Sequence, residues 1–193
     1  MVVNMEAKIQ IIGERTYLKP FELKDARSDR YLKWMRDYEI IKTLNLLSYV
    51  ENPVRQEELE SYYESIKSDG TAMFFAMYLK KSEEFIGTVK ISKINKELLT
   101  ADVGIMIGQK DCWGQGYAKE ILREVCEFLF GEHKMRKLTC GLMANNPGME
   151  RVFSGLGFQV EGRFREADYF EGNYIDHIYM GCFRNEFINE KGN

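Results

Sequence analysis

The sequence predicts one domain of mixed α/β class, with a mixed sheet that carries helices on its faces. The chain has 193 residues, and domains commonly hold about 150. Hydrophobic residues make up 45% of it, which is enough for a substantial core. Strand-like segments alternate with amphipathic helices in the middle of the chain and follow one another directly elsewhere, a pattern typical of a mixed sheet.

The first half of the chain is predicted to contain a strand, a helical region and then three strands. Apolar residues recur at helical spacing in the two helical segments, and residues of alternating character indicate the strands. The predicted elements are a strand over 16–21, one or two helices over 26–45, a helix over 54–68, strands over 73–80, 85–93 and 100–107, and a hairpin turn over 81–84.

The second half begins with a clear amphipathic helix over 117–130, which Gly131 ends. A strand is predicted over 136–144. Asn146 and Pro147 then suit the N-cap and first turn of another helix, which ends at Gly157. The two segments 158–164 and 174–183 are predicted to form a strand hairpin.

Composition excludes several classes of function. The net charge of −3 argues against a general nucleic-acid binder. No run of about 18 apolar residues predicts a membrane span, and the start of the chain does not resemble a secretion signal, so we expect a cytoplasmic protein. Its four cysteines (Cys112, Cys126, Cys140 and Cys182) lack C-x-x-C spacing. We therefore expect buried free thiols and no metal site.

The stretch between the strand at 100–107 and the helix at 117–130 is the most informative one. Gly114 and Gly116 precede the start of the helix, where unpaired N–H groups attract anions. This predicts a phosphate or pyrophosphate cradle. Neither G-x-x-x-x-G-K-[ST] nor G-x-G-x-x-G is present, which argues against a P-loop NTPase and a Rossmann dehydrogenase. A loop that merely turns the chain is the alternative.

The segment W-G-Q-G-Y-A at 113–118, after A-D-V-G-I-M-I-G, resembles the acetyl-CoA motif of GCN5-related N-acetyltransferases (GNAT). Their pattern is [QR]-x-x-G-x-[GA]; Trp113 replaces its first residue, and Gly116 and Ala118 match. The segments RTYLKPFELKDA, YLKWMRDYEI, FIGTVKI and LGFQVEGRFREADYFEGNYIDHIYMG resemble the branch with ribosomal-protein-alanine and spermidine acetyltransferases. The resemblance implies one N-acetyltransferase domain over 1–193, with a core over 14–184 and a mostly antiparallel twisted sheet with helices on both faces.

The resemblance also implies where acetyl-CoA, the acetyl donor, binds. Its pyrophosphate would lie on the loop amides, its pantetheine arm along the strand 103–107, and the strand 136–144 would splay away to open the site. Asn146 matches a contact residue and equally fits a helix N-cap. The cofactor residues implied are Val103, Ile105, Met106, Ile107, Trp113, Gly114, Gln115, Gly116, Tyr117, Ala118 and Asn146.

Catalytic groups are less well marked. The implied reaction is direct attack of a neutral amine on the thioester, which needs a base. Asp102 is the candidate base, or else a solvated or salt-bridged strand carboxylate. Phe153 occupies the place of the family's acidic Tyr, so that acid is missing; Ser154, a tyrosine of 167–174 or solvent are the substitutes. His177 suits acid–base chemistry, although a structural role is the stronger expectation.

The acceptor is expected to be a primary amine of a small molecule or peptide: a protein N-terminus, a polyamine or an amino sugar. Tyr31, Trp34 and Tyr169 are candidates for its pocket, or else core and surface aromatics. Glu166 and Asp168 could attract a cationic acceptor or form a solvated acidic loop. A homodimer is expected from the apolar strands at the end of the chain. The alternative functions are a non-catalytic acyl-CoA-binding or regulatory module and another phosphate-ligand protein.

Overall fold

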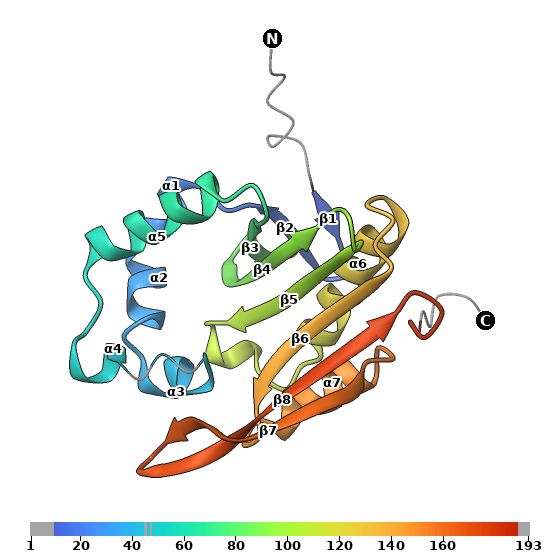
Figure 1. Cartoon of the computed structure of the whole chain (residues 1–193). Helices are drawn as coiled ribbons and strands as arrows, with labels where there is room; N and C mark the ends of the chain where they lie inside the picture. Colours follow the sequence, from blue (N-terminus) through green and yellow to red (C-terminus); the bar gives the residue numbers. More distant parts are fainter. Residues whose placement is uncertain (1–9, 45, 47, 189–193) are drawn as a thin grey trace.

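The computed structural model describes residues 10–44, 46 and 48–188, which form one eight-stranded sheet with helices against it (Figure 1). The strands lie in the order β1-β2-β3-β4-β5-β6-β8-β7. Neighbours are antiparallel except β5 and β6, which are parallel. The strands are β1 (Ile11–Ile12), β2 (Thr16–Pro20), β3 (Met73–Leu79), β4 (Phe85–Asn95), β5 (Thr100–Ile107), β6 (Lys137–Met143), β7 (Gln159–Phe170) and β8 (Asn173–Phe183). The predicted mixed, mostly antiparallel sheet is confirmed.

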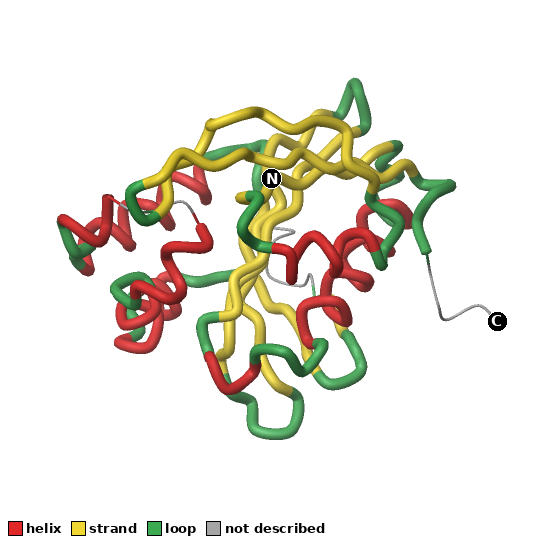
Figure 2. The backbone as a smooth tube through the Cα atoms, turned by 90° about the horizontal axis from the view of Figure 1, so that it is seen from below, coloured by secondary structure: helices red, strands yellow, loops and turns green. Residues whose placement is uncertain are grey.

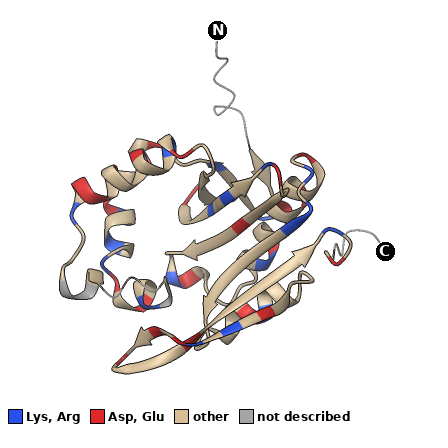
Figure 3. Cartoon of the chain, viewed as in Figure 1, with Lys and Arg blue, Asp and Glu red and all other residues tan. Residues whose placement is uncertain are grey.

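Helices cover both faces of the sheet, as predicted (Figure 2). One face carries α1 (Leu23–Ala26), α2 (Asp29–Trp34), α3 (Tyr38–Ile41), the 3₁₀ turn η2 (Lys42–Leu44), α4 (Ser48–Glu51) and α5 (Gln56–Ser68). The other face carries α6 (Tyr117–Gly131) and α7 (Pro147–Ser154), and η3 (Lys110–Cys112) precedes α6. Each helical layer closes its own hydrophobic core. Acidic and basic residues are interspersed along the helices and strands (Figure 3).

The helical region predicted over 26–45 is more broken than expected. Ser28 and Asp37 each begin a new short helix, because their side chains accept hydrogen bonds from the backbone N–H groups of Tyr31 and Glu39. Apolar spacing alone does not reveal these interruptions, since the apolar residues of each short helix still face the core.

The terminal hairpin is confirmed, but its first strand is longer than predicted. β7 runs to Phe170, whereas the prediction ended at 164. Its second half is mostly exposed and polar, and its pairing with β8 shifts register between Phe164 and Asp168. Backbone pairing with β8 therefore continues past the point where hydrophobic alternation stops. The short elements β1, α1 and α4 were not predicted, because two to four residues carry too little periodicity.

β5 and β6 separate from each other partway along their length. They pair from Thr100 with Lys137 to Asp102 with Thr139, and both strands then continue for several residues beyond these pairs. Figure 1 shows them diverging from this closed end. The predicted splay is confirmed, and it opens a gap through the sheet between the two helical layers.

Candidate active site

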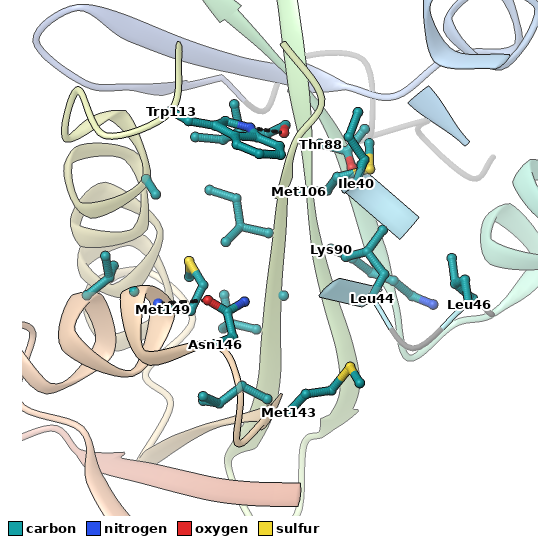
Figure 4. A pocket seen from close by; sticks show the side chains of 18 of the residues that line it. Ile40, Leu44, Leu46, Thr88, Lys90, Met106, Trp113, Met143, Asn146 and Met149 are labelled. Carbon is teal, nitrogen blue, oxygen red and sulfur yellow. Dashed lines mark hydrogen bonds between the residues drawn. The ribbon is translucent and has the colours of Figure 1, made fainter. Parts of the chain in front are cut away.

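The gap between β5 and β6 belongs to a cavity of about 920 Å³ that reaches both faces of the sheet (Figure 4). This volume is in the range of small-molecule sites. Every predicted cofactor residue except Gln115 lines it: Val103, Ile105, Met106, Ile107, Trp113, Gly114, Gly116, Tyr117, Ala118 and Asn146. The side chain of Gln115 instead donates a hydrogen bond to the Asp111 carbonyl.

The loop before α6 forms an open cradle. Gly114 and Gly116 have φ values of +70° and +82°, which side chains with a Cβ rarely adopt. A Cβ at Gly114 would meet nothing within 4 Å, and one at Gly116 would lie 3.6 Å from Arg15 Nη2. Gly116 is the N-cap of the 15-residue α6, so the first N–H groups of the helix face this space. The cradle fits an anion such as a pyrophosphate.

A buried carboxylate fixes the start of α6 to β2. Glu120 Oε1 accepts hydrogen bonds from the Arg15 and Thr16 N–H groups at 2.8 and 3.0 Å and from Thr16 Oγ1 at 2.7 Å, while Oε2 pairs with Arg15 Nε at 2.7 Å. Arg15 also donates to the Gln115 carbonyl and lies 4.4 Å from the Tyr117 ring centroid. Sequence reasoning missed this arrangement, because about a hundred residues separate its partners.

The edge of β5 that faces the gap presents backbone polar groups. Gly108 N–H donates to Ile86 O on the β4 side. Because these groups alternate along a strand, those of Val103, Ile105 and Ile107 point the other way, toward β6. Trp113 Nε1–H donates to the Ile107 carbonyl at 2.7 Å, which ties the loop to the end of β5 (Figure 4). The remaining edge suits the added-strand pairing expected for a pantetheine arm.

The start of α7 forms the other wall. Asn146 lines the cavity and is also the N-cap of α7, since its Oδ1 accepts a hydrogen bond from Met149 N–H at 3.2 Å (Figure 4). Both predicted roles are therefore compatible. Phe153 lines the cavity, is buried and packs against Phe158, so it is a core residue with no proton to give. Ser154 is exposed and is not among the described residues that line the cavity.

Asp102, the predicted base, lies at the closed end of the gap. Its Oδ2 accepts a hydrogen bond from Thr139 Oγ1 at 2.9 Å, across the last β5–β6 pair. Within the part of the chain that the structure describes, Asp102 does not line the cavity. Its contacts favour the alternative interpretation, a structural strand carboxylate.

His177 is the titratable group that the structure brings to the cavity instead. It lies on β8 and lines the cavity. Its Nδ1 lies 2.7 Å from Oδ2 of the buried Asp168, and its Nε2 lies over Gly141 of β6, 2.6 Å from where a Cβ would stand there. A carboxylate that holds one ring nitrogen fixes the orientation of the other. Asp168 was predicted in a solvated acidic loop or an acceptor site, and that loop prediction is wrong for Asp168.

The predicted acceptor residues separate into three environments. Tyr31 is buried at the wall of the cavity, and burial raises its pKa. Trp34 is a core residue: it packs on Phe85, and a Cβ on Gly108 would lie 2.0 Å from its ring. Tyr169 is 48% exposed on β7 and packs against Tyr174. Among the residues described, neither Trp34 nor Tyr169 lines the cavity.

The other predicted features are less closely tied to the cavity. Glu166 is exposed, and its N–H donates to Asp176 Oδ1. All four cysteines are buried and free, as predicted, and Cys112 lines the cavity. In residues 10–44, 46 and 48–188, no group of three His, Cys, Asp or Glu side chains is placed to hold a metal, and no helix has the length and hydropathy to cross a membrane.

Comparison with known proteins assigns the family. The acetyltransferase (GNAT) domain model matches residues 15–159. The probable N-acetyltransferase YjcK of Bacillus subtilis is 28% identical over 168 residues, which cover 86% of this chain and 92% of YjcK. The spermidine N(1)-acetyltransferase of Vibrio cholerae is 24% identical over 147 residues, covering 75% and 84% of the two chains.

The fold agrees with this assignment. The crystal structure of spermidine N-acetyltransferase from Vibrio cholerae in complex with CoA and spermine superposes with a TM-score of 0.79 at 21% identity, covering 91% of this chain and 99% of that one. The family model spans the strands β2 to β6, the cradle and α7. The chain therefore belongs to the GNAT acetyltransferase family and is an N-acetyltransferase.

Proposed function

We propose that this enzyme transfers the acetyl group of acetyl-CoA to a primary amine within a ternary complex. The observation that carries this proposal is the cavity, which joins an anion cradle at the start of α6 to the open edge of β5 and continues through the sheet to the opposite helical layer. A donor bound on one face and an acceptor bound on the other would meet in the gap. Direct transfer needs this arrangement.

In the proposed reaction the amine nitrogen bonds to the acetyl carbon while the carbon–sulfur bond breaks and the thiolate leaves. The N–H groups of Ile105 and its neighbours along the open β5 edge would stabilise the negative charge that develops on the carbonyl oxygen. The proton lost by the amine goes to Nε2 of His177, directly or through water, and Asp168 orients the ring. The contacts of His177 support this role over Asp102.

The function is tested with purified protein in two measurements. Calorimetry should detect binding of acetyl-CoA, and release of free CoA thiol should require both acetyl-CoA and an amine. Binding without turnover on any amine would favour an acyl-CoA-binding module. Preferential binding of ATP or NAD would contradict the proposal altogether.

Two further proposals concern the setting of the enzyme. Four buried free thiols are compatible with a reducing cytoplasm, where we place the protein. Exposed aromatic residues on the β7–β8 hairpin, Phe164, Tyr169 and Tyr174, support the proposed homodimer. Sedimentation at micromolar concentration tests the second proposal, and a monomer would contradict it.

A further inference from the structure

The two faces of β5 divide the cavity into a donor arm and an acceptor arm. Val103, Ile105 and Ile107 pack with the α6–α7 layer, on the side of the anion cradle. Met106 belongs to the core of the α1–α5 layer instead. If the donor occupies the cradle, the acceptor enters from the α1–α5 side. This step rests on the function proposed above.

The acceptor arm is apolar and aromatic. Its floor is formed by buried side chains, among them Tyr31, Met35 and Leu59, and Phe74 continues it toward the half-exposed Tyr62 at the rim. Among the side chains that the structure describes there, none is a carboxylate. Burial of an apolar ligand body against such walls favours binding. Binding of a polyamine is disfavoured, because several ammonium groups would lose their hydration without anionic partners.

Among the described residues that line this arm, Lys90 carries a positive charge. Lys90 of β4 lines the cavity, and its amino group points toward Leu46 (Figure 4). Its Nζ donates to the Tyr62 hydroxyl at 3.1 Å and lies 5.1 Å from the Tyr62 ring centroid. Asp69 is close enough for Lys90 to contribute to its lowered pKa, after hydrogen bonds from Thr71, but Asp69 is not one of the described lining residues. An ammonium group at an apolar pocket is complementary to an anion on the ligand.

We propose that the acceptor is a primary amine with an aromatic or branched aliphatic body and a carboxylate group. The body would occupy the apolar arm, the carboxylate would pair with Lys90 near the rim, and the amine would point into the gap toward His177. The arrangement disfavours a polyamine, although a spermidine acetyltransferase is among the relatives.

The test compares acceptors that differ in one feature. L-Phenylalanine and glycyl-L-phenylalanine are paired with their C-terminal amides, which lack the carboxylate, and spermidine is the polycationic probe. Initial rates of CoA release give kcat/KM, and calorimetry on the protein saturated with CoA gives acceptor affinity independently of turnover. We expect at least one of the two acids to exceed its amide and spermidine by tenfold or more in both measurements.

Two variants separate the charge from the fold. Lys90→Gln should lower kcat/KM and affinity for the preferred acid about tenfold while changing those for its amide less than threefold. Lys93→Gln, on the same strand but exposed and outside the described cavity lining, is the matched control and should leave both unchanged.

The outcomes distinguish this inference from the proposed function. Three results would overturn the proposed acceptor class: preference for spermidine, equal effects of Lys90→Gln on acid and amide, or failure of both acids to bind. In each case acetyl-CoA binding and amine-dependent turnover would still support acetyl transfer. A protein that does not bind acetyl-CoA would overturn both.

Discussion

Glu120 of α6 and Thr16 of β2 are joined by a buried hydrogen bond of 2.7 Å between Oε1 and Oγ1. Three further donors, the N–H of Thr16 and the N–H and Nε of Arg15, complete the shell of this carboxylate. Through these contacts the first strands of the chain hold the helix whose N-terminus forms the anion cradle. The stability of the fold and the position of the cradle therefore depend on the same side chain.

Replacing this carboxylate should destabilise the protein in a pH-dependent way. Burial by itself raises the pKa of Glu120, but the hydrogen bonds from Thr16 and Arg15 outweigh it and lower the pKa. A carboxylate with a lowered pKa stabilises the fold above its unfolded pKa, and this stabilisation is lost as the pH falls through the folded value. We expect Glu120→Gln, whose amide N–H groups oppose Arg15, to lower the free energy of unfolding by about 2 kcal/mol at pH 7.

Urea unfolding at pH 7 and at progressively lower pH measures this effect. The difference between wild type and Glu120→Gln should shrink as the pH falls. Glu132→Gln, exposed at the end of the same helix, is the control and should stay within about 0.5 kcal/mol of wild type. A pH-independent difference would contradict the assigned role.

A side chain at Gly116 should weaken acetyl-CoA binding. Gly116→Ala places a Cβ in the open cradle. The alanine would also have to adopt the left-handed backbone conformation of Gly116, which costs an L-residue about 1–2 kcal/mol. We expect the Kd for acetyl-CoA to rise tenfold or more by calorimetry. Gly172→Ala is a matched control, because Gly172 has a similar φ of +85° and a Cβ there would meet nothing within 4 Å in the β7–β8 turn. If both variants bind acetyl-CoA like wild type, the anion does not lie on this loop.

Removing the proposed base should affect turnover and not donor binding. We expect His177→Gln to lower kcat a hundredfold or more, which is the usual contribution of a general base, and to change the pH dependence of kcat. Asp168→Asn should lower kcat about tenfold, because the ring loses its orienting partner. The Kd for acetyl-CoA should stay within twofold in both variants.

His133, the other histidine of the chain, supplies the control for this experiment. It packs against Phe128 near the end of α6, so His133→Gln should leave kcat unchanged. Asp102→Asn is measured beside it. If Asp102→Asn loses turnover and the pH dependence of kcat in His177→Gln matches that of wild type, Asp102 is the base instead.

The thiols should react with electrophiles in a defined order. Burial raises the pKa of all four, to about 12 for Cys182. Cys112 is the one of them that lines the cavity. We expect slow labelling of the native protein by an aromatic disulfide reagent at pH 8, with Cys112 labelled first and protected at least threefold by a CoA thioether without a free thiol. Mass spectrometry of Cys112→Ser identifies the site, and equal labelling of all four would contradict the assignment.

The sequence by itself determined the elements with strong local signals. The alternation in 100–107, the apolar stripe of 117–130 and the caps at Asn146 and Pro147 depend on neighbours within a few residues, so they predicted β5, α6 and α7 closely. The glycines before α6 similarly marked the cradle, because a left-handed backbone needs residues without a Cβ. The order of the matching motifs along the chain predicted the family.

Tertiary structure alone decided which polar groups share the cavity. Glu120 pairs with Arg15, Lys90 lines the acceptor arm and Asp168 contacts His177. These contacts form because the sheet order brings distant strands together, and no local residue spacing encodes them. Asp102 and Asp168 are both acidic residues that the structure places on strands, Asp102 on β5 and Asp168 on β7. Their different surroundings, one bonded to Thr139 at the closed end of the gap and one buried behind a histidine, arise from packing across strands.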